Sequence, residues 1–453
     1  MDLELIEQSK FEYQLISNLE NSLKFCFLNH RESNKFSPIV FDEFVNDSIK
    51  KNVDNSMVSD GIYFLSSYKD KADYYIDTHT GLIYIKIGDR FRVAVNTCFS
   101  KEYDVFDAAY LRKYLNNANF RNQIAFAPVG PITSLNYLGT NIEDIFSEPI
   151  LEYEVSTLQE LEDLISEIEK ILCKSRFFNK LWFRGQRKEY LSTRTASTIK
   201  KLGFPDSYQK MPSLIPSLGR NIENGSFDKI QLANTYWDKA FRVWVLSQMQ
   251  GYGSAFSRGT KSYNQLISGL EAPKMMEFIN HCSYDIEDVL IIKREEELTM
   301  VLAMQQYGAQ TSVLDITDDL DVALFFSQSC FNNKTKKFEL CEPNSENVIY
   351  VMAQCRGTGT VDLSVDLYKQ LSFSFDEAIP LPARIKRQKC GIQTGANMYA
   401  KNTYAYRVIA RIKLNGSNIL TKKTVSEMFP NATEDSLYQT FLDARPTLDG
   451  LYG

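Results

Sequence analysis

The stretch Leu181-Trp182-Phe183-Arg184-Gly185-Gln186 guides the interpretation of the whole chain. Its apolar and aromatic residues predict a strand in a protein core. An arginine at the end of such a strand needs an anionic partner, because it cannot lose its charge by deprotonation. The glycine beside it leaves the backbone open to a ligand. Two interpretations follow: a guanidinium that binds a phosphate or carboxylate ligand, or a structural arginine paired with an acidic residue of the same domain.

Length and composition narrow the function classes. The 453 residues suit two or three domains, two being the simplest division, and 44% hydrophobic with 24% charged residues is ordinary for a globular protein. A net charge of -6 argues against general attraction to nucleic acid or anionic membranes. The sequence has no apolar run of about 18 residues and no secretory signal, so we expect a cytoplasmic protein that does not enter a membrane. Eight scattered cysteines and three histidines predict reduced thiols and no metal site.

Residues 1–150 predict an N-terminal α+β domain without a catalytic pattern. Its predicted elements are helical sequence over 3–28, a strand at 61–65, a hairpin of strands 82–87 and 91–95, and a helix over 104–116. His79 lies in a turn sequence, which favours a turn residue over a ligand. We expect this domain to serve recognition or regulation.

A domain boundary is predicted near residue 150. Thr157 and Glu160 form a capping box, which marks the start of a helix. One apolar stripe then runs along that helix, made of Leu158, Leu161, Leu164, Ile165, Ile168, Ile171 and Leu172. The second predicted domain covers residues 151–453 and contains the Arg184 stretch.

Asp315 is the most conspicuous carboxylate of this second domain. It lies within a short apolar strand predicted at 312–316, so it needs a partner, and Arg184 or Arg220 is the expected one. A buried ion pair that holds two strands together is the structural alternative. Thr317 is predicted to cap the helix that follows, with acidic residues in its first turn.

A later strand is predicted over 404–414. Apolar and charged residues alternate there, with Tyr406, Val408, Ala410, Ile412 and Leu414 on one face and Arg407, Arg411 and Lys413 on the other.

Three blocks together resemble the FRG-domain family, named for its Phe-Arg-Gly motif. They are Trp182-Phe183-Arg184-Gly185-Gln186 with the following Leu214 to Arg220, the stretch from Gln305 to Thr317, and Arg384-Ile385-Lys386-Arg387-Gln388-Lys389-Cys390-Gly391. The resemblance covers about residues 150–435. The second block departs from the family pattern at four positions, where His, Pro, Arg and Trp are replaced by Gln306, Gln310, Ser312 and Ile316.

The family layout is similar to that of ADP-ribosyltransferases. The resemblance therefore implies an α+β protein whose FRG domain has a bent, split β-sheet core with NAD in its cleft. Members are often bacterial toxins or phage-defence effectors. The implied function is a transferase or NAD glycohydrolase, an intracellular effector that modifies a macromolecular target, with an antitoxin or inhibitor protein as a further partner.

The resemblance assigns roles to individual residues. Arg184, Thr311, Gln388 and Asp315 are the implied catalytic residues, and Arg184, Gly185, Gln186, Arg220, Tyr307 and Thr311 the implied NAD-binding residues. Phe183 is an alternative to Tyr307 for stacking on the nicotinamide. Because an amide cannot act as a base, either Asp315 or Glu377 would have to supply that function, or the target would need no base.

A second hypothesis belongs to another class. The same domain could be a non-catalytic module that senses a nucleotide or a phosphorylated ligand. The amide of Gln388, where a Glu is expected, favours this module, whereas the polar residues kept in three blocks favour an active site. A nuclease is a distant third, because no carboxylate cluster or histidine pair for a metal is evident.

Overall fold

A computed structural model of the chain describes residues 62–68, 72–77, 79–80, 83–87, 90–94, 105–124, 146–175, 178–217, 241, 244, 303–311, 313–332, 334–335, 337–355, 360–374, 380–393 and 402–442. The chain divides into two compact units, each made of several stretches. Unit 1 comprises residues 1–215, 342–360 and 394–420, and unit 2 comprises 216–341, 361–393 and 421–453. The boundary predicted near residue 150 stays a prediction. The helical sequence over 3–28, Arg220 and Glu377 lie outside the described residues.

Unit 1 contains most of the described elements. In chain order they are β1 (Ile62–Tyr68), β2 (Ala72–Asp77), β3 (Ile83–Ile87), β4 (Arg90–Ala94), α3 (Val105–Asn116), α4 (Ala118–Ile124), β5 (Leu151–Val155), α6 (Leu158–Leu172), β6 (Phe178–Gln186), β7 (Leu191–Thr193), α7 (Ala196–Leu202), the 3-10 helix η3 (Asp206–Gln209), β8 (Lys210–Pro212), β12 (Val348–Cys355), α17 (Thr403–Tyr406) and β15 (Ala410–Leu414).

Unit 2 contains shorter elements. They are β9 (Leu314–Thr317), α14 (Leu320–Gln328), β10 (Ser329–Asn332), β11 (Lys337–Leu340), β13 (Thr360–Asp362), which begins at the unit border, α15 (Leu363–Ser374), α16 (Ala383–Arg387), β14 (Cys390–Gln393) and α18 (Val425–Met428).

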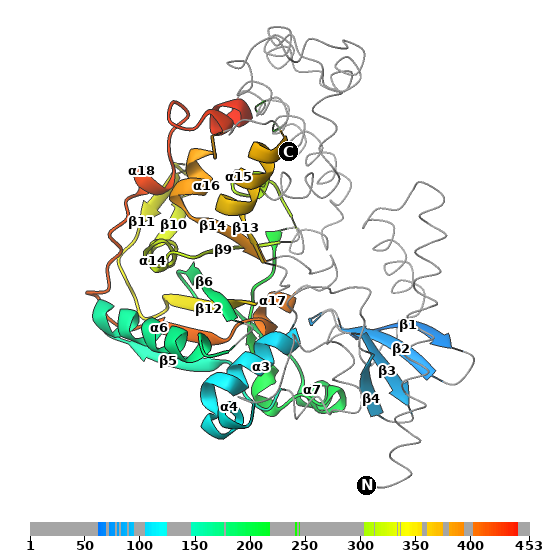
Figure 1. Cartoon of the computed structure of the whole chain (residues 1–453). Helices are drawn as coiled ribbons and strands as arrows, with labels where there is room; N and C mark the ends of the chain where they lie inside the picture. Colours follow the sequence, from blue (N-terminus) through cyan, green and yellow to red (C-terminus); the bar gives the residue numbers. More distant parts are fainter. Residues whose placement is uncertain are drawn as a thin grey trace, which may run out of the picture. The chain divides into compact units, whose positions relative to one another are not determined.

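Among the described residues, the sheet with the most strands has seven, in the order β13-β14-β9-β6-β12-β15-β5. It is a mixed sheet: β12 runs antiparallel to both β6 and β15, β14 runs antiparallel to β9, and β15 runs parallel to β5. The chain is therefore a mixed α/β protein, as the sequence predicts at this coarse level. Figure 1 shows α6 running beside β5, which precedes it in the chain.

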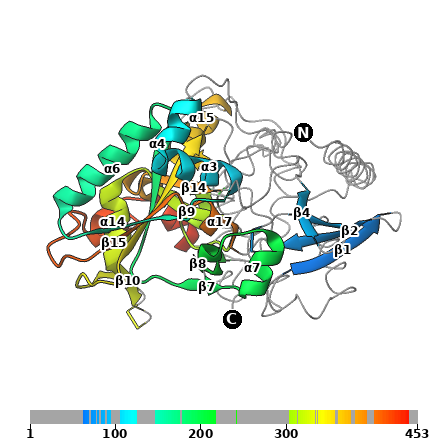
Figure 2. The ribbon, with the colours of Figure 1, turned by 90° about the horizontal axis from the view of Figure 1, so that it is seen from below.

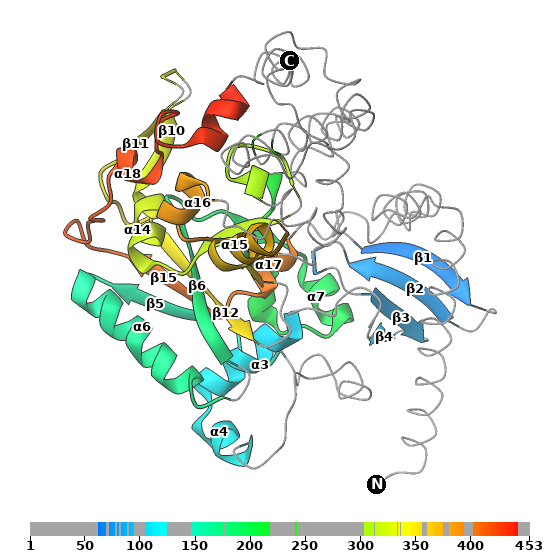
Figure 3. The same ribbon diagram turned by 45° about the horizontal axis from the view of Figure 1, so that its top comes forward.

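A separate four-stranded sheet is formed by β1 to β4 in sequence order, all antiparallel (Figure 3). The predicted hairpin is confirmed, with β3 and β4 paired from Ile83 opposite Ala94 to Ile87 opposite Arg90. The helix predicted over 104–116 is confirmed as α3. β7 and β8 form a small antiparallel pair (Figure 2). α7 and η3 lie between them in the chain.

Helix α6 confirms the strongest helix prediction. The Thr157 side chain accepts a hydrogen bond from the Glu160 N–H at 3.1 Å, as an N-cap should. The Glu160 carboxylate reaches one residue further back than a capping box requires and accepts from the Ser156 N–H at 2.7 Å. The predicted stripe supplies the buried face, which consists of Leu161, Ile165, Ile168 and Leu172.

Two buried arginines hold unit 1 together. Arg194 forms an ion pair with Asp77 at 2.9 Å, and both side chains are almost fully buried, 1% and 0% exposed. Thr80 donates a further hydrogen bond to Asp77 at 2.7 Å, and the His79 N–H donates another at 3.0 Å. His79 lies in a turn, as predicted. We refer to Asp77, Thr80 and Arg194, together with Arg112 and Tyr208, as the closed arginine cluster.

Arg112 is the second of these arginines and projects from α3. Its guanidinium donates to the carbonyl oxygens of Tyr406 and Val408 at 3.1 and 2.7 Å and to the Tyr208 hydroxyl at 2.8 Å. That hydroxyl in turn donates to the Glu148 carbonyl at 3.0 Å. The fold itself therefore neutralises or hydrogen-bonds terminal nitrogens of both guanidinium groups, as buried charges require. Nε of Arg112 is buried without a hydrogen-bond partner among the described residues.

The strand predicted over 404–414 is wrong in its first half. Residues 403–406 form the short helix α17, and the strand β15 begins only at Ala410. Arg407, expected on an exposed face, is 1% exposed and packs its guanidinium over the Tyr404 ring at 5.2 Å. All residues from 402 to 410 are buried, so apolar alternation there could not distinguish a helix from a strand.

The helix start predicted at Thr317 is also wrong. Thr317 is the last residue of β9, and the N-cap of α14 is Asp319, whose side chain accepts from the N–H groups of Asp321 and Val322. Burial raises the pKa of Asp319, but these bonds and Lys389, 3.0 Å away, outweigh it and lower that pKa below its usual range. Thr317 instead donates its hydroxyl to the Gln388 carbonyl at 2.8 Å.

Candidate functional site

Arg184 lies near the end of β6, on a strand built as the sequence predicts. Leu181, Trp182 and Phe183 are 3%, 0% and 4% exposed, whereas Arg184 is half-buried. The Trp182 indole donates to the Gln354 side chain at 3.2 Å, and Lys180 lies over the Trp182 ring at 4.0 Å. The apolar residues thus fix the strand in the core and carry Arg184 to the edge of the buried region.

A polar row crosses the unit 1 sheet at the position of Arg184. Tyr350 on β12 lies directly opposite Arg184 on one side and opposite Arg411 on the other, and Arg411 lies opposite Glu152 on β5. Residues directly opposite one another on neighbouring strands project to the same face of a sheet. We call these four residues, Arg184, Tyr350, Arg411 and Glu152, the Tyr350 row.

Charges of both signs surround Tyr350. Arg411 is paired with Glu189 at 2.5 Å and also with Glu152, whose side chain is 65% exposed. Burial raises the pKa of the Tyr350 hydroxyl and Glu189 adds to this increase, whereas Arg411 and Arg184 oppose it. Tyr350 therefore stays protonated over the physiological pH range and can donate a hydrogen bond to an acceptor.

Among the buried polar atoms of this face that have no hydrogen-bond partner in the described residues, two belong to uncharged side chains. One is the hydroxyl oxygen of Tyr350, a residue that is 0% exposed, and the other is Oε1 of Gln186. Gln186 stands two residues after Arg184 on β6 and so projects to the same face. A buried polar group without a partner costs about 1–3 kcal/mol, so such groups need an explanation, and a ligand is one.

The second sequence block orients a carboxylate within unit 2. Gln305 and Gln306 each donate a side-chain amide to Oδ1 of Asp315 at 2.6 Å. The arginine partner predicted for Asp315 stays a prediction. Asp315 remains half-buried on β9.

Thr311 and Tyr307 of the same block are buried and engaged. Thr311 is 5% exposed, and its hydroxyl accepts from the Val313 N–H at 3.3 Å. The Tyr307 hydroxyl donates to Asp435 at 2.9 Å, and the Arg384 guanidinium lies over its ring at 4.7 Å. The side chains predicted to position ribose and to stack on nicotinamide therefore already have contacts inside unit 2.

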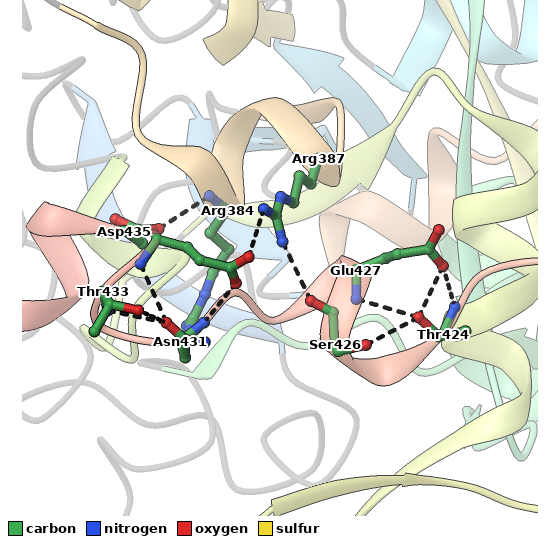
Figure 4. Close-up of polar contacts among 9 residues, drawn as sticks. Arg384, Arg387, Thr424, Ser426, Glu427, Asn431, Thr433 and Asp435 are labelled. Carbon is green, nitrogen blue, oxygen red and sulfur yellow. Dashed lines mark hydrogen bonds and ion pairs between the residues drawn. The ribbon is translucent and has the colours of Figure 1, made fainter.

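The third block packs against the C-terminal part of unit 2 (Figure 4). The Arg384 N–H donates to Asp435 at 3.0 Å, while Arg387 contacts the Ser426 carbonyl at 3.2 Å and Glu434 at 3.3 Å. Gln388 is 4% exposed. Its side-chain amide donates to the Met428 carbonyl at 2.8 Å, so this amide connects two segments of unit 2.

The predicted site residues fall into both units. Arg184, Gly185 and Gln186 belong to unit 1, whereas Tyr307, Thr311, Asp315 and Gln388 belong to unit 2. Within unit 1 the structure brings Arg184 and Gln186 together with Tyr350. Within unit 2 it brings Asp315 together with Gln305 and Gln306. The predicted convergence of Arg184, Thr311 and Gln388 on one ligand stays a prediction.

The sequence interpretation missed Tyr350, Glu189 and the role of Arg411. A sequence pattern pointed to Arg411, because the alternation of apolar and charged residues along β15 places it on the polar face of that strand. No local pattern pointed to Tyr350, because it lies in an apolar run. Only the pairing of β12 with β6 and β15 gives Tyr350 two arginine neighbours.

The described part of the chain holds no group of three or more His, Cys, Asp or Glu residues arranged for a metal ion. None of the described helices is long and apolar enough to cross a membrane. In comparisons with known proteins, no family model, no curated protein and no solved structure matches this chain.

Proposed function

We propose that this chain binds the phosphate groups of a nucleotide at the Tyr350 row. The observation that carries the proposal is the buried Tyr350 hydroxyl, which lacks a hydrogen-bond partner among the described residues and lies between two arginines. A protonated phenol donates to a phosphate oxygen, and guanidinium groups match phosphate geometry with two parallel bonds. Lys413, two residues after Arg411 on the same face, adds positive charge.

NAD is the nucleotide that the sequence resemblance favours. The FRG-like blocks imply an ADP-ribosyltransferase layout with a bent, split sheet, and Arg184 is the arginine of the first block. The diphosphate of NAD carries the charge that the row would bind. The binding role alone requires no catalytic base, which agrees with the buried Gln388 amide bonded to Met428.

ADP-ribosyl transfer or NAD hydrolysis is the second candidate function. Its specific support is Asp315, a half-buried carboxylate held by two glutamine amides in the second block. A carboxylate in a fixed orientation can stabilise an oxocarbenium-like transition state or accept a proton. Under this proposal the chain is an intracellular toxin or phage-defence effector that acts on a macromolecular target and is held silent by an inhibitor protein.

Binding is tested by calorimetry with NAD, ADP-ribose and nicotinamide riboside, the last of which lacks phosphate. We expect the wild type to bind the first two and not the third. Tyr350→Phe should weaken binding about tenfold or more, because a hydrogen bond to a charged group contributes about 1.5–3 kcal/mol. Tyr208→Phe is the matched control, since its hydroxyl already has two protein partners, and should leave affinity unchanged. Equal affinity of wild type and Tyr350→Phe would overturn the assignment of the row.

Turnover is tested separately, by incubating radiolabelled NAD with the full chain and cell lysate. Label that reaches protein or nucleic acid with the wild type, but not with Asp315→Asn or Arg184→Lys, supports transfer. Binding of NAD without its consumption supports a sensing module and rules out the second candidate.

A further inference from the structure

β10 and β11 form an antiparallel hairpin in unit 2 (Figure 3). Two cysteines lie on or next to its strands. Cys330 lies on β10 opposite Glu339, and Cys341 directly follows β11. The Cys341 N–H donates to the Gln328 carbonyl at 2.8 Å, which continues the pairing of the two strands. Cys341 stands two positions after Glu339, so the two cysteine side chains are diagonal neighbours on one face of the hairpin.

The two sulfur atoms are in contact. Their Sγ atoms are 2.7 Å apart, and both residues are partly exposed. A disulfide requires about 2.05 Å, so the sulfurs need to approach by only about 0.7 Å more. The strand pairing supplies this proximity, and the partial exposure gives a dissolved oxidant access to the pair.

Two other cysteines, Cys173 and Cys390, have described side chains and differ from this pair. Cys390 is buried, and burial together with Asp315 raises the pKa of its thiol well above the usual value. Cys173 is exposed at the end of α6 and has no cysteine beside it among the described residues. Among the four cysteines whose side chains are described, proximity and access are therefore combined only in the hairpin.

We propose that Cys330 and Cys341 are a site of reversible oxidation and form a disulfide across the hairpin. The oxidant is a small-molecule disulfide such as oxidised glutathione. One cysteine thiolate attacks a glutathione sulfur, which forms a mixed disulfide and releases one glutathione thiolate. The second cysteine thiolate then attacks the protein sulfur of that mixed disulfide, which forms the Cys330–Cys341 bond and releases the second glutathione. Two protein thiols are oxidised, one glutathione disulfide is reduced, and both protons end on glutathione.

The bond acts on a hairpin that is packed against the rest of unit 2. Phe338 of β11 stacks on Phe429 with ring centroids 4.2 Å apart, and the Arg384 guanidinium lies 5.3 Å from the Phe429 ring. Oxidation thus restrains the two strands beside the packing contacts of the third sequence block. This inference does not depend on nucleotide binding in unit 1.

The test equilibrates the full chain in glutathione buffers of increasing oxidised fraction, blocks remaining thiols by alkylation, and maps the peptides by mass spectrometry. We expect a peptide pair joined through Cys330 and Cys341, lighter by two hydrogen masses than the reduced pair and restored by dithiothreitol. In Cys341→Ser, Cys330 should carry a glutathione instead, while Cys173→Ser should leave the cross-link unchanged.

The proposal fails if both hairpin cysteines are alkylated in oxidised buffer, or if each carries its own glutathione in the wild type. Because the cross-linked peptides are measured on the wild-type chain, this test decides the proposal even if a cysteine variant does not fold.

Discussion

The closed arginine cluster and the Tyr350 row, both in unit 1, differ in how the fold satisfies their arginine and tyrosine side chains. In the closed arginine cluster, Arg194 is paired with Asp77 and Arg112 donates to two carbonyls and to Tyr208. In the Tyr350 row, the Tyr350 hydroxyl is buried between two arginines with no hydrogen-bond partner among the described residues. The closed arginine cluster therefore serves stability through its ion pair and its terminal nitrogens, although Nε of Arg112 is also buried without a hydrogen-bond partner among the described residues. An outside ligand is expected at the row, where the incomplete group is a hydroxyl between two cations.

The largest expected effect is the loss of the ion pair in the closed cluster. Asp77→Asn leaves the buried Arg194 charge without its carboxylate, and we expect the free energy of unfolding to fall by about 3–5 kcal/mol. Urea denaturation followed by circular dichroism measures this loss. A decrease of the free energy of unfolding by less than about 1 kcal/mol would mean that the closed arginine cluster does not hold unit 1 together. The cluster would then no longer differ from the Tyr350 row in its role for stability.

A matched pair of tyrosine substitutions sharpens the comparison. Tyr208→Phe removes a hydroxyl bonded to Arg112 and Glu148, and we expect a loss of about 1–3 kcal/mol. Tyr350→Phe removes a hydroxyl without a partner in the described protein, so the free energy of unfolding should change by less than about 0.5 kcal/mol or increase. The same denaturation curves, measured without nucleotide, distinguish the two. Equal losses would show that the Tyr350 hydroxyl has a structural role.

The smallest expected effect appears at alkaline pH. Because the pKa of Tyr350 is raised in the folded chain, the unfolded chain releases this proton first as the pH passes about 10. The protonated Tyr350 hydroxyl therefore makes its full contribution to the free energy of unfolding below pH 10, and this contribution is lost as the pH rises towards the pKa of the folded chain. Between pH 10 and pH 11, wild type should lose about 1 kcal/mol more than Tyr350→Phe. If wild type and Tyr350→Phe lose the same free energy of unfolding over this pH range, the Tyr350 pKa is not raised by folding and its hydroxyl is in contact with solvent.

Local sequence patterns were sufficient where one element supplies its own signal. The apolar stripe and the Thr157 cap located α6, and the alternating runs around residues 88–90 located the β3–β4 hairpin. The apolar run before Arg184 correctly placed that arginine on a core strand. These features depend on residues close together in the chain, so periodicity and capping chemistry decide them.

The composition of the candidate site was decided by tertiary structure. Tyr350 meets Arg184 and Arg411 only because β12 pairs with strands more than 50 residues away in sequence, and in one particular register. A shift of one residue would turn each side chain of that strand to the opposite face of the sheet. For the same reason the partners of Asp315 and Gln388 could not be assigned in advance. The sequence determined elements that carry their own local signal, such as α6 and the β3–β4 hairpin. Tertiary packing decided the buried stretch 402–410 and, through long-range strand pairing, which polar groups the fold satisfies and which remain for a ligand.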